Sequence, residues 1–507
     1  MAQLNVDLSK VPPAVAPSEP NRSRVWSANQ NAVFDFVEHG TGNAIVNAVA
    51  GSGKTTTIVE ALSRVQGSSI FLAFNKSIAE ELKARGVNAR TFHSLTYSPV
   101  TRLKNTRQVD PDKLRKIMRL EFKGNDEIVY GSFCTKLVSL AKQVGMGALI
   151  RETPDIWMHL VDFHDLEVDH EDGDLGRGMQ LASHLLQLSN ESPMVDFDDL
   201  LYLAVKEGLS LPKFDFVFVD EAQDTNAIQR AILRKIMIPG RSRMVAVGDP
   251  AQAIYGFRGA DSNSLRLIAE EFDAIELPLT VSYRCATSIV AHARTWVDHI
   301  EPAPTAPVGL VEHLGTDWNP NRFQALDLIV CRTTKPLVSL GYKLLRAHVP
   351  ARILGKEIGR SLCTLIEKQK AKGVDALVAK LEIWREREVE KARARQDEGK
   401  VDAVHDKVDA IVCLIEGLPE TKRTIPALLE VIGTLFSDAA GTVTLATIHK
   451  AKGLEAETVY WLNSSQQPCK WAKQEWQQDQ ERNLCYVAAT RAKSRLVLIE
   501  DGSAKNA

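Results

Sequence analysis

Short apolar runs alternate with longer stretches of helical periodicity over most of the chain. This alternation is typical of parallel sheets with helices on both faces. Strands that are buried on both faces need not alternate polar with apolar residues. The runs fall in two groups, which predicts an α/β fold with two lobes. We expect strands at 45–49, 70–73, 216–219 and 244–247 in the first lobe, and at 328–331, 352–354, 443–446, 459–462 and 496–499 in the second.

Two long segments lack these runs and look helical. Each interrupts a lobe, so we interpret both as mostly helical insertions. Residues 385–400 of the second insertion are intensely charged, which indicates a solvated helix face; contact with DNA or a partner is the alternative. The expected division is a tail at 1–22, a first lobe at 23–100 plus 197–276, an insertion at 101–196, a second lobe at 277–355 plus 441–501, an insertion at 356–440 and a tail at 502–507.

Composition narrows the class of protein. A length of 507 residues predicts about three or four domains. The seven cysteines contain no C-x-x-C pair, which fits reduced thiols in a cytosol. No apolar run reaches about 18 residues and the first 20 lack a secretory pattern, so neither a membrane span nor a signal peptide is expected. The net charge of −2 attracts no nucleic acid globally, so any DNA-binding groups must line a local groove.

The segment AVAGSGKT at 48–55 follows an expected strand and opens an apolar helix. This is the context of a P-loop, in which backbone N–H groups and a helix N-terminus hold phosphate oxygens. Lys54 should reach the β- and γ-phosphates, and the Thr55 hydroxyl should bind Mg²⁺. The alternative is a glycine-rich turn that matches the pattern by chance.

Two carboxylates end the apolar run at 216–219. Ligands of open α/β sheets bind at the carboxyl ends of strands, which is where Asp220 and Glu221 stand. Asp220 would hold Mg²⁺, and Glu221 would orient and deprotonate the attacking water. Phosphoryl transfer also needs positive charge at the γ-phosphate, for which Arg284 and Arg491 are candidates. Taken singly, the carboxylates also fit polar capping and the arginines also fit surface ion pairs.

Nine motifs stand in one order along the chain: AVAGSGKT, AFNKSIAEEL, TFHSL, DFDDLL, VDEAQD, VGDPAQAIYGFRGA, LTVSYRC, VTLATIHKAKGLEAETVY and ERNLCYVAATRAK. In this order they resemble the superfamily 1 helicases of the UvrD/Rep/PcrA type. The wording AFNKSIA and TIHKAKGLE is most similar to the F-box DNA helicase and its bacterial and phage relatives. The resemblance implies two RecA-like P-loop lobes, ATP and Mg²⁺ as cofactors, and a P-loop that begins with Ala48. We expect no F-box ahead of the core and therefore no ubiquitin-ligase role.

The resemblance also implies roles for single residues. Gln30 would read the adenine, Tyr283 would stack on it, and Gln252 would sense the γ-phosphate. Glu455 would lie near the ribose, beyond the tight turn at Gly453. Arg284 and Arg491 would both face the γ-phosphate from the second lobe. The residues implied to bind the nucleotide are Gln30, Ala50, Gly51, Ser52, Gly53, Lys54, Thr55, Thr56, Tyr283 and Glu455.

Nucleic acid would be held by stacking and by phosphate contacts. Tyr255 and Phe257 match the base-stacking motif of the family, although relatives often carry Trp at the second position. A stacked base is worth about 1–3 kcal/mol whatever its identity. The candidates for backbone contact are Asn75, Lys76, His93 and Arg258.

The sequence therefore predicts an ATP-dependent motor on single-stranded DNA and its junctions with duplex, in repair, recombination or replication. Family resemblance alone implies 3′-to-5′ polarity, and a cytoplasmic, nucleoid-associated protein of a bacterial or phage-infected cell. One alternative is the NTPase subunit of a nuclease-coupled repair or defence complex, which would need a protein partner. Another is an ATP-switched single-strand clamp with negligible turnover.

Overall fold

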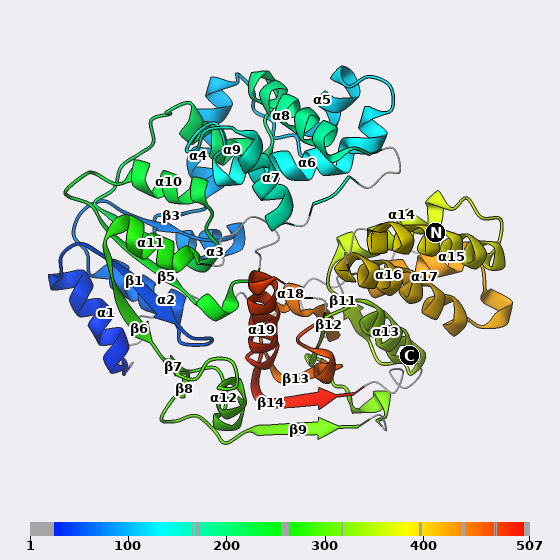
Figure 1. The fold of residues 1–507 in the computed structure, drawn as a ribbon. Coiled ribbons are helices and arrows are strands. Elements are labelled where there is room, and N and C mark those ends of the chain that lie inside the picture. The colour runs from blue at the N-terminus through cyan, green and yellow to red at the C-terminus, as the bar shows by residue number, and fades with distance from the viewer. Residues whose placement is uncertain are drawn as a thin grey trace, which may run out of the picture.

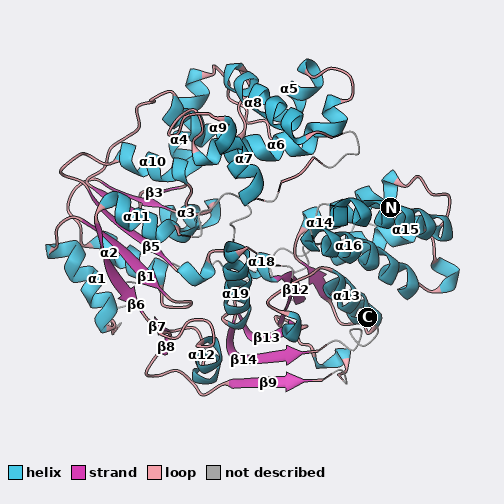
Figure 2. Cartoon of the chain, viewed as in Figure 1, coloured by secondary structure: helices cyan, strands magenta, loops and turns pink. Residues whose placement is uncertain are grey.

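The computed structural model describes residues 25–164, 166–168, 173–254, 263–315, 318–394, 398–437, 442–470, 472 and 474–500. Its centre is two six-stranded sheets, each in its own lobe and each carrying helices on both faces (Figures 1 and 2). All strand pairs in the two sheets are parallel. The expected α/β class with two RecA-like lobes is confirmed.

The first sheet has the strand order β3-β2-β4-β5-β1-β6. Its central strands are apolar and buried, because helices cover both faces. The order places the carboxyl end of β1 beside that of β5, with β4 one strand further. The strands are β1 (Asn43–Ala48), β2 (Ser69–Leu72), β3 (Ala89–Arg90), β4 (Phe216–Val219), β5 (Arg243–Gly248) and β6 (Ala274–Leu279).

Different helices cover the two faces of the first sheet. One face packs on α1 (Ala28–His39), α2 (Lys54–Ser63) and α3 (Lys76–Ala84). The other face packs on the remaining helices of this lobe and is continuous with the core of the first insertion. Those helices are α4 (Phe92–Leu103), α9 (Phe197–Lys206), α10 (Ala227–Ile236) and α11 (Ser264–Phe272).

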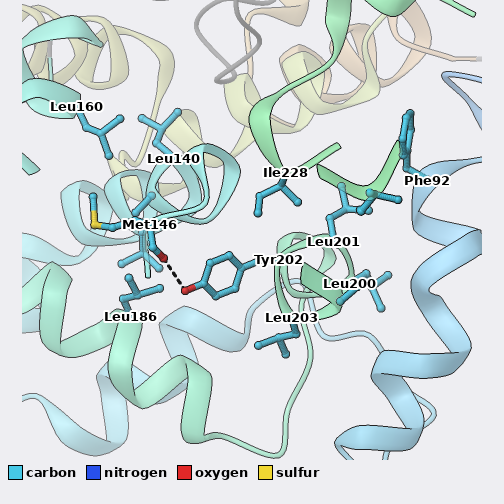
Figure 3. Close-up of a cluster of buried hydrophobic side chains, with 14 of the residues drawn as sticks. Phe92, Leu140, Met146, Leu160, Leu186, Leu200, Leu201, Tyr202, Leu203 and Ile228 are labelled. Carbon is cyan, nitrogen blue, oxygen red and sulfur yellow. Dashed lines mark hydrogen bonds between the residues drawn. The ribbon is translucent and has the colours of Figure 1, made fainter. Parts of the chain in front are cut away.

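The first insertion is helical and does not have a core of its own. Figure 3 shows its side chains interleaved with those of α9, where the Tyr202 hydroxyl donates to the Met146 carbonyl oxygen at 2.7 Å. Because α4 continues through the expected boundary at 100/101, the insertion and lobe form one packed body. The insertion helices are α5 (Lys113–Glu121), α6 (Asp126–Val144), α7 (Pro154–Phe163) and α8 (Leu175–Glu191).

The second sheet has the order β11-β12-β10-β13-β14-β9. One face packs on α13 and on the helices of the second insertion, and the other on α12, α18 and α19. The strands are β9 (Leu310–Leu314), β10 (Leu328–Cys331), β11 (Ala351–Ile353), β12 (Val443–Thr447), β13 (Ala456–Leu462) and β14 (Ala492–Ile499). The helices are α12 (Thr287–Ala293), α13 (Lys335–Arg346), α14 (Lys356–Lys368), α15 (Val374–Ala394), α16 (Glu398–Gly417), α17 (Ile425–Leu435), α18 (Ile448–Ala451) and α19 (Glu475–Ala489).

Edge strands correct the expected organisation. The boundary at 276/277 is wrong because it cuts β6, which pairs with β1 as far as Leu279. The strands β3, β6 and β9 are not among those expected from the sequence. All three are edge strands; β3 has only two residues, and the side chains of β6 and β9 are largely exposed or half-buried. Such strands lack the unbroken apolar run of a central strand. A short ladder of β7 (Val281–Ser282) and β8 (Glu301–Pro302) follows β6 and leads into the second lobe.

Candidate nucleotide site between the lobes

The P-loop lies between β1 and the N-terminus of α2, as its sequence predicts. Gly51 and Gly53 have φ angles of +73° and +78°, a region that side chains with a Cβ rarely adopt. A Cβ on Gly51 would also lie 2.5 Å from the Cβ of Arg284. The loop is therefore packed directly against the chain of the second lobe.

The carboxylates at the end of β4 face this loop. The Thr55 hydroxyl donates to a carboxylate oxygen of Asp220 at 3.0 Å, so the two expected Mg²⁺ ligands are in contact. Burial, and then the charge of Glu221, raise the pKa of Asp220 to about 6. Among the described residues no group of three or more His, Cys, Asp or Glu could hold a metal ion. One carboxylate and one hydroxyl fit Mg²⁺, which commonly completes its shell with water and substrate phosphates.

Glu221 is held in an unusual conformation. Its φ and ψ are 52° and 41°, the left-handed region, and its side chain accepts a hydrogen bond from Gln223. Burial alone would raise the pKa of Glu221, but the charges of Lys54 and then Lys452 outweigh burial and lower that pKa. The group therefore stays ionised, as a general base must.

The second lobe contributes two arginines. Arg284 pairs with Glu455 at 2.8 Å, and Lys493 holds the other oxygen of Glu455 at 2.7 Å. Arg491 is buried and donates to the Val487 and Leu454 carbonyl oxygens at 2.9 and 3.1 Å. Burial, and then the positive charge of Arg284, lower the pKa of Arg491 to about 10. This arginine is therefore held in place before any anion arrives.

A cavity of about 410 Å³ joins these groups across the two lobes. The P-loop and the β4 end supply one wall, and the two arginines supply the opposite one. Gly453, with φ of +86°, makes a turn at the rim. The lining residues are Gly51, Ser52, Gly53, Lys54, Thr55, Thr56, Phe74, Asn75, Ile78, Glu221, Gln252, Arg284, Lys452, Gly453 and Arg491.

The expected adenine residues lie together beside this cavity. The Gln30 amide nitrogen donates to the Thr57 hydroxyl at 3.0 Å, and its oxygen accepts from the Ser27 N–H and, at 3.4 Å, from the Tyr283 hydroxyl. Tyr283 is 46% exposed, so part of its side chain is accessible to a bound base. Neither Gln30 nor Tyr283 is part of the cavity lining, and both stay candidates for the base.

The expected DNA residues separate into three groups. Asn75 lines the nucleotide cavity and caps α3 by accepting from the Ile78 N–H at 2.9 Å, so its position favours the nucleotide over DNA. Lys76 and His93 line a second cavity of about 620 Å³, which we call the first-lobe groove. Tyr255, Phe257 and Arg258 lie outside the described residues. The groove is lined by Phe74, Lys76, Ala79, Glu80, Lys83, Thr91, His93, Ser94, Tyr97, Val109, Phe197 and Leu200.

A buried ion cluster holds the aromatic rim of this groove. Lys142 contacts the carboxylates of Asp196 and Asp199, each at 2.8 Å, and Lys113 contacts Asp199 at 2.6 Å. The two aspartates cap the first turn of α9, where Phe197 is 56% exposed. The Phe197 and His93 rings meet edge to face at 6.3 Å. The DFDDLL motif thus fixes a solvent-facing ring by burying its acidic neighbours.

Two contacts between the lobes were not anticipated from the sequence. The Lys452 ammonium lies 2.6 Å from a carboxylate oxygen of Asp224 and donates to the Gln252 carbonyl oxygen at 2.8 Å. The Tyr486 hydroxyl accepts from the Ala50 N–H at 2.8 Å. Lys452 and Tyr486 both lie within the motifs described above, but those motifs do not indicate which residue of the first lobe each one contacts.

The sheets and this shared cavity define a two-lobed P-loop nucleotide-binding protein. Residues 28–273 match the family model of the UvrD/REP helicase N-terminal domain, and residues 366–501 match that of the UvrD-like helicase C-terminal domain. The chain belongs to the UvrD/Rep/PcrA-type superfamily 1 helicases.

Three relatives show how far the similarity extends. F-box DNA helicase protein 1 of Schizosaccharomyces pombe is 25% identical over 497 residues, covering 89% of this chain and 55% of the relative. ATP-dependent DNA helicase Rep of Salmonella typhimurium is 27% identical over 296 residues, covering 51% and 41%. F-box DNA helicase 1 of Gallus gallus is 23% identical over 556 aligned positions, covering 98% and 52%. The chain thus spans about half the length of the curated relatives it matches.

Proposed function

We propose that this protein is an ATP-dependent DNA helicase or translocase that moves on single-stranded DNA. The observation that supports this most strongly is the shared cavity, where Arg284 and Arg491 of the second lobe stand opposite Lys54 and Glu221 of the first. A nucleotide held there touches both lobes, so its hydrolysis changes how the lobes contact each other. The names of the relatives supply DNA as the track.

The chemistry follows from the positions of the side chains. Lys54 binds the terminal phosphates, and Glu221 takes the proton of the attacking water. Thr55 and Asp220 would hold Mg²⁺, which neutralises phosphate charge when bound. Arg284 and Arg491 stabilise the charge that spreads over the transferred phosphoryl group, an effect worth about 10³–10⁵ in rate for an arginine finger.

Movement follows from differential affinity. The two arginines favour a triphosphate over the products, so ATP draws the lobes together and hydrolysis releases them. The first-lobe groove supplies aromatic rings and Lys76 for a grip on one side. Separating a DNA duplex costs about 1.4 kcal/mol per step, which one ATP per nucleotide covers comfortably. Polarity of 3′ to 5′ and a role in repair, recombination or replication belong to this proposal.

The experiment that tests the proposal compares polynucleotides as activators. Single-stranded DNA should stimulate ATP hydrolysis more strongly than RNA of equal length, and duplexes with a 3′ tail should be unwound in preference to those with a 5′ tail. Hydrolysis that neither polynucleotide stimulates would refute a motor. Strong DNA binding with negligible turnover would favour an ATP-switched clamp instead. Hydrolysis restored only by an added nuclease or repair factor would favour a subunit of a larger assembly.

Magnesium and location complete the proposal. Chelation of Mg²⁺ should abolish hydrolysis while leaving DNA binding in place, since Phe74 is the one residue that the groove lining shares with the nucleotide cavity and it is not an expected Mg²⁺ ligand. Among the residues that the structure describes, no helix is long and apolar enough to cross a membrane. We propose a cytoplasmic, nucleoid-associated protein, for which imaging of the tagged chain in cells is the test.

A further inference from the structure

The first insertion touches the second lobe through an aromatic pair. Phe163, the last residue of α7, stacks on Trp476 near the start of α19, with ring centroids 5.6 Å apart and planes 20° from parallel. The Gln474 amide donates to the Asp162 carbonyl oxygen at 3.4 Å, and the Trp476 indole N–H donates back to Gln474. Figure 1 shows α7 reaching toward the N-terminal end of α19. We call Phe163 and Trp476 the clasp.

The clasp is a small contact that can open. An aromatic pair contributes about 0.5–1.5 kcal/mol beyond the area it buries. Phe163 is still 37% exposed, and the accompanying hydrogen bond is long. By contrast, the Lys452–Asp224 pair that links the two lobes is buried. The clasp is therefore a weaker link to the second lobe than the Lys452–Asp224 pair.

The clasp closes a circuit of contacts. The first lobe and its insertion share one hydrophobic core. The second lobe joins the first through the Tyr486–Ala50 hydrogen bond and the Lys452–Asp224 ion pair. The clasp joins the second lobe back to the insertion. First lobe, insertion and second lobe thus form a closed ring.

Two grooves lie on this ring. The first-lobe groove lies between α3, α4 and α9. A cavity of about 540 Å³ lies at the carboxyl ends of β10 and β13, where its lining includes Thr333, Lys470 and Arg332, the last in an ion pair with Glu481. The chain that leaves this cavity at Lys470 reaches Gln474 and the clasp within four residues. A strand held by both grooves would run between the lobes beside the clasp.

We infer that the contact between Phe163 and Trp476 completes a ring of protein around the bound strand. Only a strand with a free end can enter this ring while the clasp is closed, so the clasp distinguishes linear from circular DNA. This inference rests on the proposed function, because it needs DNA in the two grooves. A circular strand enters only when the clasp parts, and it stays linked to the protein once the clasp has closed.

Covalent closure of the clasp tests this inference. The variant Phe163→Cys/Trp476→Cys is joined by a short bismaleimide, either before or after DNA is added. Closure before addition should leave binding to linear single strands intact and reduce binding to circular single strands at least tenfold. Closure after addition should leave the circular complex intact at a salt concentration that dissociates the unclosed complex. Each single-cysteine variant, treated with the same reagent, controls for reaction at the native cysteines.

The outcomes separate the inference from the function on which it rests. Equal binding of circular and linear strands by the closed protein, with equal loss in salt, would overturn the inference. A failure of the two cysteines to cross-link in the folded protein would overturn it as well. If the unclosed protein binds neither DNA, the proposed function fails instead. The variant Phe163→Ala/Trp476→Ala should load on circles faster than the unaltered protein and leave them faster, and unchanged rates would also count against the clasp.

Discussion

The Tyr486 hydroxyl of the second lobe accepts a hydrogen bond from the backbone N–H of Ala50, at the start of the P-loop, with a distance of 2.8 Å. Both residues are fully buried and stand 436 positions apart in the chain. A buried N–H must find a partner, so the P-loop in this conformation depends on the opposite lobe. The lobes are thus linked at the nucleotide site by a contact that needs no nucleotide.

Tyr486→Phe removes this acceptor and keeps the ring. A buried donor left without a partner costs about 1–3 kcal/mol, so we expect the KM for ATP to rise roughly fivefold to 100-fold. Steady-state hydrolysis over a range of ATP concentrations measures this. Tyr342→Phe is the matched control, because Tyr342 donates to the Gly417 carbonyl oxygen in the second insertion, away from the cavity. Equal effects of the two variants would mean that the Tyr486 hydroxyl has no special link to ATP.

Glu221→Gln should keep ATP binding and lose hydrolysis, because the amide cannot accept the proton of water. Lys54→Ala should lose both, since the P-loop lysine contributes to binding as well as to rate. We expect kcat to fall by about 10²–10⁴ in Glu221→Gln, the usual worth of a positioned base. Binding of a fluorescent ATP analogue and phosphate release measure the two steps separately. Lost binding in Glu221→Gln would point to a structural role for this carboxylate.

The parts of the fold that the sequence predicts well are those buried on both sides. The strands expected at 216–219 and 328–331 match β4 and β10 residue for residue, because a central parallel strand is apolar throughout. β6 and β9 escape the same reasoning, since an edge strand keeps half-exposed side chains and β6 even contains Pro278. The expected boundary between the lobes at 276/277 is wrong for this reason.

The residues of the site also differ in how well the sequence predicts them. The P-loop, Asp220 and Glu221 follow from local motifs because strand, turn and chemistry are adjacent in sequence. Lys452 and Tyr486 act through partners more than 200 residues away, and periodicity carries no information about such contacts. Family resemblance brought Arg284 and Arg491 to the cavity, where the structure also places them, but it did not indicate that Asn75 lines the same space.

Acid should weaken Mg²⁺ binding and stabilise the nucleotide-free protein. Burial and Glu221 raise the pKa of Asp220 to about 6, above its ordinary value of 3.8. The folded state therefore binds a proton that the unfolded state has released, so this group's contribution to stability falls as pH rises from about 4 to 6. Asp220→Asn should accordingly raise the melting temperature at pH 7 by a few degrees and abolish Mg²⁺-dependent hydrolysis. Calorimetry of Asp220→Asn and the unaltered protein at pH 5 and 7 checks this prediction, because the gain in melting temperature should be larger at pH 7. An equal gain at both pH values would contradict the raised pKa of Asp220.

Phe197→Ala should weaken binding of single-stranded DNA by about 1–3 kcal/mol, or roughly fivefold to 100-fold in Kd. The ring is 56% exposed at the first-lobe groove, so its loss should leave the core intact. Anisotropy of a labelled oligonucleotide at several salt concentrations gives both affinity and salt dependence. The slope against salt should not change, because no phosphate contact is removed. Leu120→Ala is the control, an apolar side chain 78% exposed on α5 and outside the groove.

Lys452 is the residue through which closure of the lobes should act on Glu221, the proposed general base. Lys452→Met leaves the buried Asp224 carboxylate without its cation, which costs about 3–5 kcal/mol in comparable buried pairs. We expect kcat to fall about tenfold or more, with Lys452→Arg restoring part of it.

The charge of Lys452 also lowers the pKa of Glu221, so Lys452→Met should move the acid limb of the kcat–pH profile to higher pH. Asp224→Asn in the same chain should recover some of the lost rate, because no unpaired charge stays buried. A uniform fall in kcat across pH, with no recovery in the double variant, would show that Lys452 does not tune the base.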